Sequence, residues 1–229
     1  MWDRLSEQIY LNFIKDDRWQ YFTNGLEVTL IIAFFAALLG IVIGLVVGVI
    51  RSTHEKTHKL KFLNFLCSIY LTVIRGTPVV VQLMIIYYII LANARNKIPV
   101  AILAFGINSG AYVAEIIRAG VQAVDSGQME AARSLGLTGS QAMFKVVLPQ
   151  AVRNILPALG NEFVNMIKQV SLASVFFINE LTTSYKTVLA ATYIPIESII
   201  IAGLIYLLVT TVLSQAVNVM EWKMRLAEG

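Results

Sequence analysis

The chain has 229 residues, of which 57% are hydrophobic and only 14% are charged, and its formal net charge is +4. Soluble domains carry nearer a quarter charged residues, so this composition excludes an ordinary soluble protein. The modest positive charge is typical of the cytoplasmic loops of membrane proteins rather than of nucleic-acid binding. We therefore expect an all-α integral membrane protein with one membrane domain.

Residues 1–25 mix aromatic and charged side chains, which is typical of an external segment at a membrane interface; the alternative is a polar tail. Residues 28–50 are uncharged, and about 20 helical residues cross the hydrocarbon core, so they predict the first span. Gly40, Gly44 and Gly48 give this helix a smooth face. We favour a contact of this face within the chain over one with another subunit.

Residues 51–61 carry four Lys/Arg and predict a cytoplasmic loop. Residues 62–74 are apolar but short for a span, so they favour an interfacial or elbow helix. After a break at Arg75–Pro78, the uncharged run 76–94 predicts the second span. A single kinked helix over 62–94 is the alternative.

Residues 98–124 predict the third span, with Asn108 near its middle. Glu115 and Arg118 lie three residues apart near its cytoplasmic end, and this spacing predicts that they neutralise each other.

The polar stretch 125–150 predicts two short helices joined by a tight turn. Gly136 suits the left-handed position that ends the first helix, and Pro149 is expected to limit the second. Capping-box spacing occurs twice, at Asp125 with Gln128 and at Thr138 with Gln141.

The first of these helices has a narrow face with small side chains, which suits the groove of another protein. The residues that form or flank this face are Glu130, Ala131, Ala132, Arg133, Leu135 and Gly136. A DNA-reading helix-turn-helix has a similar layout, but apolar segments close on both sides argue against it. A hairpin that only connects two spans is the second alternative.

Residues 154–180 predict a fourth span that starts at a break near Pro157 and Gly160 and is unusually polar. Polar side chains in lipid are costly, so this stripe is expected to face protein or a water-filled substrate path. The stripe consists of Asn161, Glu162, Asn165, Lys168 and Gln169, and Asn108 of the third span is assigned to the same path. The alternative is hydrogen bonding between helices without a path.

Residues 181–197 predict an external loop, 198–220 a fifth span, and 223–229 a cytoplasmic tail. The permease domain would then cover residues 26–222. With the N-terminus outside and the C-terminus inside, eleven Lys/Arg are cytoplasmic, six are external and Lys168 is in the membrane. The positive-inside bias supports this orientation.

The spacing from Glu130-Ala131-Ala132 through Gly136 to Leu148-Pro149 resembles the EAA signature of ABC importer permeases. The runs RGTP at Arg75–Pro78 and NSGAYVAEIIRAG at Asn108–Gly120 are similar to the polar amino-acid branch of that family. The sequence departs from the family at Val146, where isoleucine is usual. It departs again at Gln169, where an acidic residue is usual. The loss of one negative charge near the expected path weakens the case for a cationic substrate.

This resemblance implies a type I ABC importer permease with five transmembrane helices, in the cytoplasmic membrane, that carries polar amino acids inward. Its 125–150 loop would hold the coupling helix that docks on a dimer of ATP-binding subunits. A second permease copy or a paralogue and an extracytoplasmic substrate-binding protein would complete the complex.

The chain has no glycine-rich phosphate loop, no catalytic constellation and no metal-ligand cluster in its sequence. The expectation is therefore a transport subunit, not an enzyme, with no cofactor of its own, ATP and Mg²⁺ being bound by the partner ATPase. A stand-alone secondary transporter or channel is the alternative function, and a membrane scaffold or receptor component is a third.

Overall fold

The computed structural model describes residues 2–226, and within this range the chain forms helices and no strand. The α-helices are α1 (Trp2–Ile9), α2 (Trp19–Thr57), α3 (Lys61–Gly76), α4 (Val79–Ile85), α5 (Ile98–Gln122), α6 (Ser126–Ser134), α7 (Gly139–Ala142), α8 (Leu148–Gln169), α9 (Leu181–Thr192) and α10 (Pro195–Leu226). Shorter π- and 3-10-helical turns are η1 (Tyr10–Ile14), η2 (Lys15–Asp17), η3 (Ile86–Ile90), η4 (Met143–Val147) and η5 (Val170–Phe176). The all-α prediction is confirmed.

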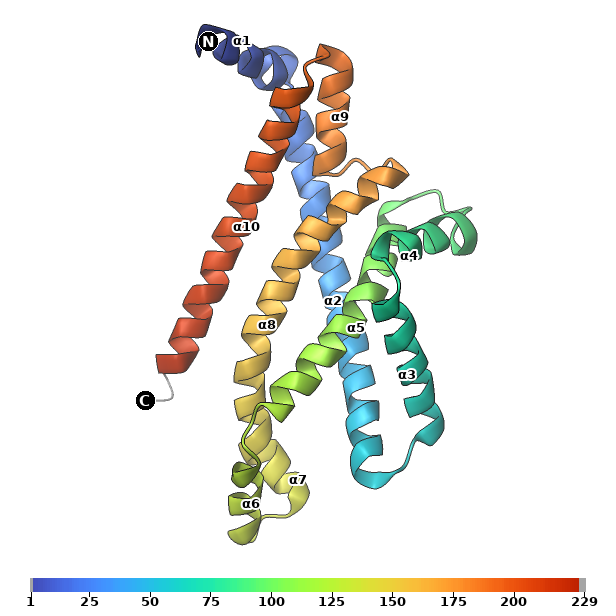
Figure 1. The fold of residues 1–229 in the computed structure, drawn as a ribbon, viewed down its shortest axis with the longest axis vertical. Helices are drawn as coiled ribbons and strands as arrows, with labels where there is room; N and C mark the ends of the chain where they lie inside the picture. The colour runs from blue at the N-terminus through green and yellow to red at the C-terminus, as the bar shows by residue number, and fades with distance from the viewer. Residues whose placement is uncertain (1, 227–229) are drawn as a thin grey trace.

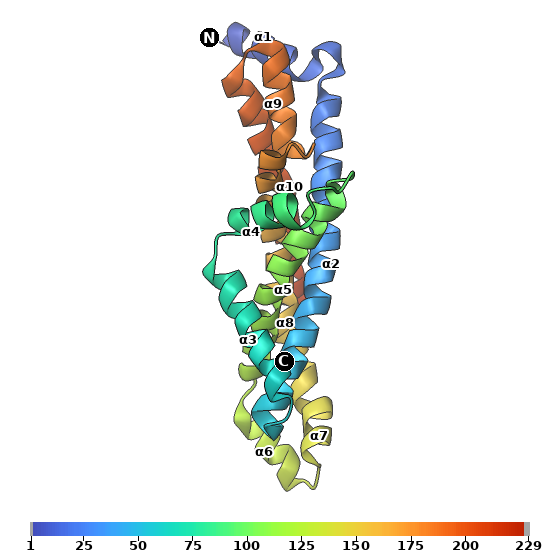
Figure 2. The ribbon, with the colours of Figure 1, turned by 90° about the vertical axis from the view of Figure 1, so that its right-hand side faces the viewer.

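The molecule is elongated, and its two ends differ (Figures 1 and 2). Helices α1 and α9 lie at one end, while α6 and α7 form the opposite tip. Helices α2, α5, α8 and α10 run between these ends, so the polar loop 125–150 lies far from the N-terminal segment. This separation matches a protein with one end on each side of a membrane.

Helices α2 and α5 form the central contact of the bundle, and glycines allow their close approach. An added Cβ at Gly44 would lie 2.5 Å from Val113 Cγ1, and one at Gly40 would lie 2.8 Å from Ser109 Cβ. From the other side, a Cβ at Gly106 would lie 2.6 Å from Leu39 Cδ2. The smooth face of α2 therefore packs within the chain, as expected.

The apolar stretch between residues 61 and 94 forms a bent pair of helices rather than one straight span. Helix α3 and the segment Val79–Ile90 meet at 112° across the break at Thr77 and Pro78. Pro78 has no N–H and favours an extended backbone before it, which ends α3. The run 76–94 is helical only over Val79–Ile90, which is too short to cross the hydrocarbon core alone.

The segment from α7 to α8 remains helical through two prolines that were expected to interrupt it. Pro149 lies in the first turn of α8 and has no N–H to donate, while the Leu148 N–H before it donates to the Met143 carbonyl. The π-helical turn η4 leads directly into that turn. Pro157 lies inside α8, which continues to Gln169, so the expected break at Pro157 and Gly160 is absent from the described chain.

Two stretches expected to be loops are helical. Helix α2 continues past its apolar run as far as Thr57 and ends at His58, which has a left-handed backbone. Residues 181–192 form α9, whose first N–H groups are capped by the buried carboxylate of Glu180. Buried Asn12 then ties the N-terminal segment to this end of the bundle, because it accepts hydrogen bonds from Thr192 Oγ1 and Ser198 Oγ.

Among the described residues, α2, α5 and α10 are long and apolar enough to cross a membrane, and the bent pair would make a fourth span. Helix α8 is also long enough, at 22 residues, but its polar side chains keep it out of this set. The count of five spans therefore stays a prediction.

Candidate functional site

The tip helix α6 has a defined start and stop. Asp125 Oδ1 accepts a hydrogen bond of 2.6 Å from the Gly127 N–H, which caps the start. At its end, Gly136 has φ +88 and donates to the Arg133 carbonyl, while the Leu137 N–H donates to the Ala132 carbonyl. These two bonds form a Schellman motif, which favours glycine at this position. The predicted role of Gly136 is confirmed.

Helix α7 follows after a short turn and carries the second predicted cap. Thr138 Oγ1 accepts from the Gln141 N–H, and Gln141 Oε1 accepts from the Thr138 N–H, so this capping box is complete. The box predicted at Asp125 does not form, because Asp125 caps the Gly127 N–H instead of the Gln128 N–H, and Gln128 Oε1 accepts from Gln150 Nε2 at 3.4 Å. The turn between the two short helices is thus held at both sides.

Most of the α6 residues that resemble the EAA signature face outward. Glu130, Ala131 and Arg133 are exposed, and the Leu135 side chain is 86% exposed although it is apolar. Ala132 is only 4% exposed, so it faces the rest of the bundle. Glu130 and Arg133 lie three residues apart, a spacing at which they could pair, but no ion pair joins them among the described residues, so both charges remain on the outer face.

The structure adds Phe144 to this tip, a residue that the sequence argument missed. Its side chain is 69% exposed. It borders a groove of about 540 Å³ between the end of α2 and the tip helices, lined by Ser52, Thr53, Met129, Arg133, Gly139, Ser140, Met143 and Phe144. Exposed apolar side chains beyond the apolar spans mark a surface for another protein rather than for lipid.

The second candidate site is the polar stripe on α8. Asn161, Asn165 and Lys168 are exposed and follow one another at helical spacing, so they form one open polar line. Gln169 is half-buried beside them, and its Oε1 is buried with no hydrogen-bond partner among the described residues. A line of this kind in a membrane helix requires cover by protein or water, because lipid offers it no partners.

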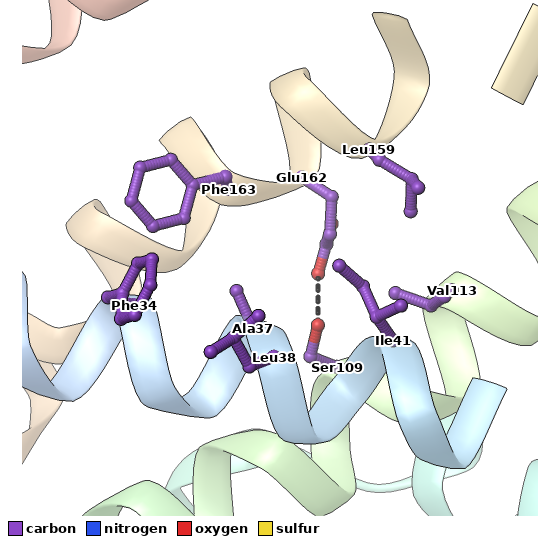
Figure 3. A pocket seen from close by; sticks show the side chains of 9 residues that line it. All are labelled: Phe34, Ala37, Leu38, Ile41, Ser109, Val113, Leu159, Glu162 and Phe163. Atoms are coloured by element: carbon purple, nitrogen blue, oxygen red, sulfur yellow. Dashed lines mark hydrogen bonds between the residues drawn. The ribbon is translucent and has the colours of Figure 1, made fainter. Parts of the chain in front are cut away.

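Glu162 lies on the adjacent face of α8 and points into a pocket between α2, α5 and α8. Its Oε1 accepts a hydrogen bond of 3.2 Å from Ser109 Oγ of α5, which Figure 3 shows. The pocket has a volume of about 220 Å³, and the other residues that line it are Phe34, Ala37, Leu38, Ile41, Val113, Leu159 and Phe163. One carboxylate in an otherwise apolar pocket is suited to a cationic group on a partly apolar solute.

Asn108 is separate from this stripe, although it precedes Ser109 in the chain. Its side chain is buried and donates a hydrogen bond of 2.9 Å to Gln82 Oε1. Gln82 Nε2 in turn donates to the carbonyls of Ile74 and Thr77. The two amides therefore stabilise the bend between α3 and α4. A lone glutamine in the apolar run 79–92 was the sequence signal for this contact.

Near the tip end of α5, Glu115 accepts hydrogen bonds from Arg118, as its spacing predicted. The structure also places Arg75 Nη1 of α3 at 3.4 Å from Glu115 Oε2. The Arg75–Pro78 break is thus anchored to α5 by an ion pair that local spacing did not indicate.

Comparisons with known proteins agree with this geometry. Residues 40–226 match the family described as binding-protein-dependent transport system inner membrane component. Among curated relatives, the nopaline transport system permease protein NocM of Agrobacterium fabrum is 39% identical over 86% of this chain and 85% of its own length. The arginine transport system permease protein ArtQ of Bacillus subtilis is 35% identical over 90% of this chain and 93% of its own.

Solved structures show the same fold. An amino acid ABC transporter, crystallised with histidines, has a chain that superposes with a TM-score of 0.83 and 41% identity, covering 89% of this chain and 94% of that one. The MetNI methionine ABC transporter matches with a TM-score of 0.68 over 90% of this chain and 99% of that one, at 18% identity, which supports the fold alone. The chain therefore belongs to the family of binding-protein-dependent transport system inner membrane components, which are membrane permease subunits of ABC transporters.

Proposed function

We propose that this chain is the permease subunit of an ABC importer that carries a polar amino acid into the cell. The observation that carries the proposal is the tip helix α6, which is capped at both ends and presents Glu130, Arg133 and Leu135 outward. Such a face is suited to a partner groove. The names of the nopaline and arginine permeases, and of the L-cystine transport system permease protein TcyB of Bacillus subtilis, which is 33% identical, support an amino acid or a derivative as the solute.

The energy source in this proposal is a separate dimer of ATP-binding subunits. The docking residues would be Glu130, Ala131, Ala132, Arg133, Leu135 and Gly136, with the exposed ring of Phe144 beside them. ATP and Mg²⁺ would be bound by that partner. Because α6 is packed onto the bundle through Ala132, a movement of the partner would be passed to the membrane helices.

The solute path in this proposal follows α8. Glu162 would receive the ammonium group, and Lys168 the carboxylate. Asn161 and Asn165 would donate or accept hydrogen bonds, and the free Oε1 of Gln169 would accept one. A second permease copy or a paralogue would cover the open stripe, because lipid cannot satisfy it. Asn108 would act on the path indirectly, through its hydrogen bond to Gln82.

The proposed topology puts α6 in the cytoplasm and the N-terminal segment 1–25 outside, where a substrate-binding protein would deliver the solute. The permease domain would cover residues 26–222 and lie in the cell membrane. Residues 223–229 would form a tail on the cytoplasmic side. The excess of Lys/Arg on the α6 side of the apolar runs supports this orientation.

Affinity purification of the tagged full chain from its native membrane tests the proposal. We expect an ATP-binding subunit to copurify, together with a second permease chain, and we expect a bound polar amino acid to be released on denaturation. Glu130→Lys, which reverses a charge on the outer face of α6, should remove the ATP-binding subunit but leave the second permease. Isolation of a chain that carries no ATPase and transports alone would favour a secondary transporter instead.

A further inference from the structure

A positively charged groove lies between Arg51, near the end of α2, and residues 68–76 of α3. It shares no lining residue with the groove at the tip or with α8. It has a volume of about 570 Å³. Arg51 of α2 forms one wall, and Ser68, Thr72 and Arg75 of α3 form the other. The Ser68 hydroxyl donates to the Asn64 carbonyl of its own helix, so the donors that face the groove are two guanidinium groups and the Thr72 hydroxyl, which are suited to a phosphate.

The local charges do not balance. Arg75 and Arg118 share the single carboxylate of Glu115, and Arg51 and Glu55 line the same small hollow as Glu115 and Arg118. Three guanidinium groups thus meet two carboxylates, which leaves one positive charge. Next to a membrane interior, an unbalanced charge is costly, so an anionic ligand would lower the free energy of this region.

Arg51 also has a donor without an acceptor. Its Nε atom is buried and forms no hydrogen bond with the described residues. A buried N–H that lacks an acceptor is destabilising, and the groove is the open space beside this side chain. Because this Nε is buried, a ligand oxygen in the groove would become its acceptor once the Arg51 side chain turns toward the open space.

The surroundings of the groove favour a lipid as the source of that oxygen. Ser68, Thr72 and Arg75 lie along one line of α3, at helical spacing. The adjoining face of the helix carries only large exposed apolar side chains, namely Phe62, Phe65, Leu66, Ile69 and Val73. The groove also lies at Arg51, where the uncharged run 28–50 of α2 ends. A phosphate at this depth would have acyl chains alongside the apolar face.

We propose that this groove binds the phosphodiester of one anionic phospholipid in the leaflet on the α6 side. Basic pockets between membrane helices recognise such head groups. Arg51 and Arg75 would bind the phosphate, and the hydroxyl group of Thr72 would donate a hydrogen bond to it, while Ser68 Oγ, which donates to the Asn64 carbonyl, would line the wall. The exposed apolar face of α3 would pack against the acyl chains. The lipid would then link α2 to α3 at the base of the bent helix pair.

Native mass spectrometry of the full chain, purified in detergent and titrated with phosphatidylglycerol or phosphatidylcholine, tests this site. The wild-type chain should retain one phosphatidylglycerol in preference to phosphatidylcholine. Each of Arg51→Gln and Arg75→Gln should weaken that binding roughly five-fold, as expected for one basic side chain near a membrane surface. The matched control Lys145→Gln, which removes the same charge from the tip, should bind phosphatidylglycerol like the wild type.

Two further arms separate the possible results. Millimolar inorganic phosphate should not displace the lipid; displacement would show a site for a free anion and would overturn the proposal. Equal binding of the two lipids by the wild type, or an equal loss in the Lys145→Gln control, would also overturn it. If an arginine variant fails to fold, Thr72→Ala keeps every charge, removes the hydroxyl donor of the groove and should still weaken phosphatidylglycerol binding.

Discussion

At the scale of single residues, Glu162 differs most from its surroundings. It is the one acidic residue among the nine that line its pocket, and its only recorded hydrogen bond in the described chain comes from Ser109 at 3.2 Å. A buried carboxylate normally has several donors or a cation, so this group has capacity left for a ligand. The role proposed for Glu162, the binding of a solute ammonium, would use this capacity.

We expect Glu162→Gln to weaken transport of the native solute about ten-fold or more, since hydrogen bonds to charged groups contribute about 1.5–3 kcal/mol. The measurement is the KM for uptake by the assembled complex. Ser109→Ala is the matched control, because it removes the hydrogen bond and keeps the carboxylate, and it should change uptake less. Unchanged kinetics in Glu162→Gln would show that the pocket is outside the path.

The α8 stripe also shows what sequence could predict at this scale. Helical spacing placed Asn161, Asn165 and Lys168 on one face, and the structure confirms that shared face. The assignment of Asn108 to the same path stays a prediction, but its hydrogen bond to Gln82, which lies 26 residues away on another helix, was not foreseen. Contacts of this range depend on how helices pack, which a local pattern does not contain.

At the scale of helices, the close contact of α2 with α5 requires glycine at particular positions along α2. An added Cβ at Gly44 would lie 2.5 Å from Val113 Cγ1 and 2.9 Å from the Ala114 backbone nitrogen. At Gly48, one turn further, the nearest atom would lie at 3.4 Å, an ordinary contact. The two glycines look alike in the sequence, but the structure separates them.

We expect Gly44→Ala to destabilise the protein by about 1–3 kcal/mol, because the two backbones would have to move apart. The matched variant Gly48→Ala should be neutral or slightly stabilising, since alanine favours a helix over glycine by about 1 kcal/mol. Thermal unfolding of the two variants in the same detergent measures this difference. A loss of equal size in both would contradict the packing at Gly44.

The tip helices follow local rules, so the sequence predicted them well. Caps and turns depend on neighbouring residues, which explains why the roles of Thr138, Gln141 and Gly136 are confirmed. The break expected near Pro157 did not occur, because α8 keeps the proline within a long packed helix. The break at Arg75–Pro78 was predicted from local residues, but the angle of 112° between α3 and the segment Val79–Ile90 was not, since it depends on the contacts of Gln82 and Arg75.

Gly136→Val should affect coupling more than folding. Its φ of +88 is unfavourable for a residue with a Cβ by about 1–2 kcal/mol, so the end of α6 should lose its present shape. We expect the variant to insert normally but to pull down less ATP-binding subunit and to lose solute-stimulated ATP hydrolysis. Gly139→Val is a control in the same loop, because Gly139 has no positive φ and open space around it. Wild-type coupling in Gly136→Val would mean that the α6–α7 hairpin only connects two helices.

At the scale of the whole molecule, the two candidate sites are joined along the chain. A short turn connects α6 to α7, and α7, η4 and α8 then run on as one continuous helical segment that carries the polar stripe. Helices α2 and α5, packed on each other, form the other side of the pocket. This layout fits a permease that is moved by a partner at its tip and opens beside α8.

The most direct test of this account is uptake of labelled polar amino acids by vesicles that contain the purified chain with its ATP-binding subunit and binding protein. The account predicts accumulation of one such solute only when the chain, the ATP-binding subunit and ATP are all present. Uptake by the chain alone, driven by an ion gradient and indifferent to ATP, would contradict it.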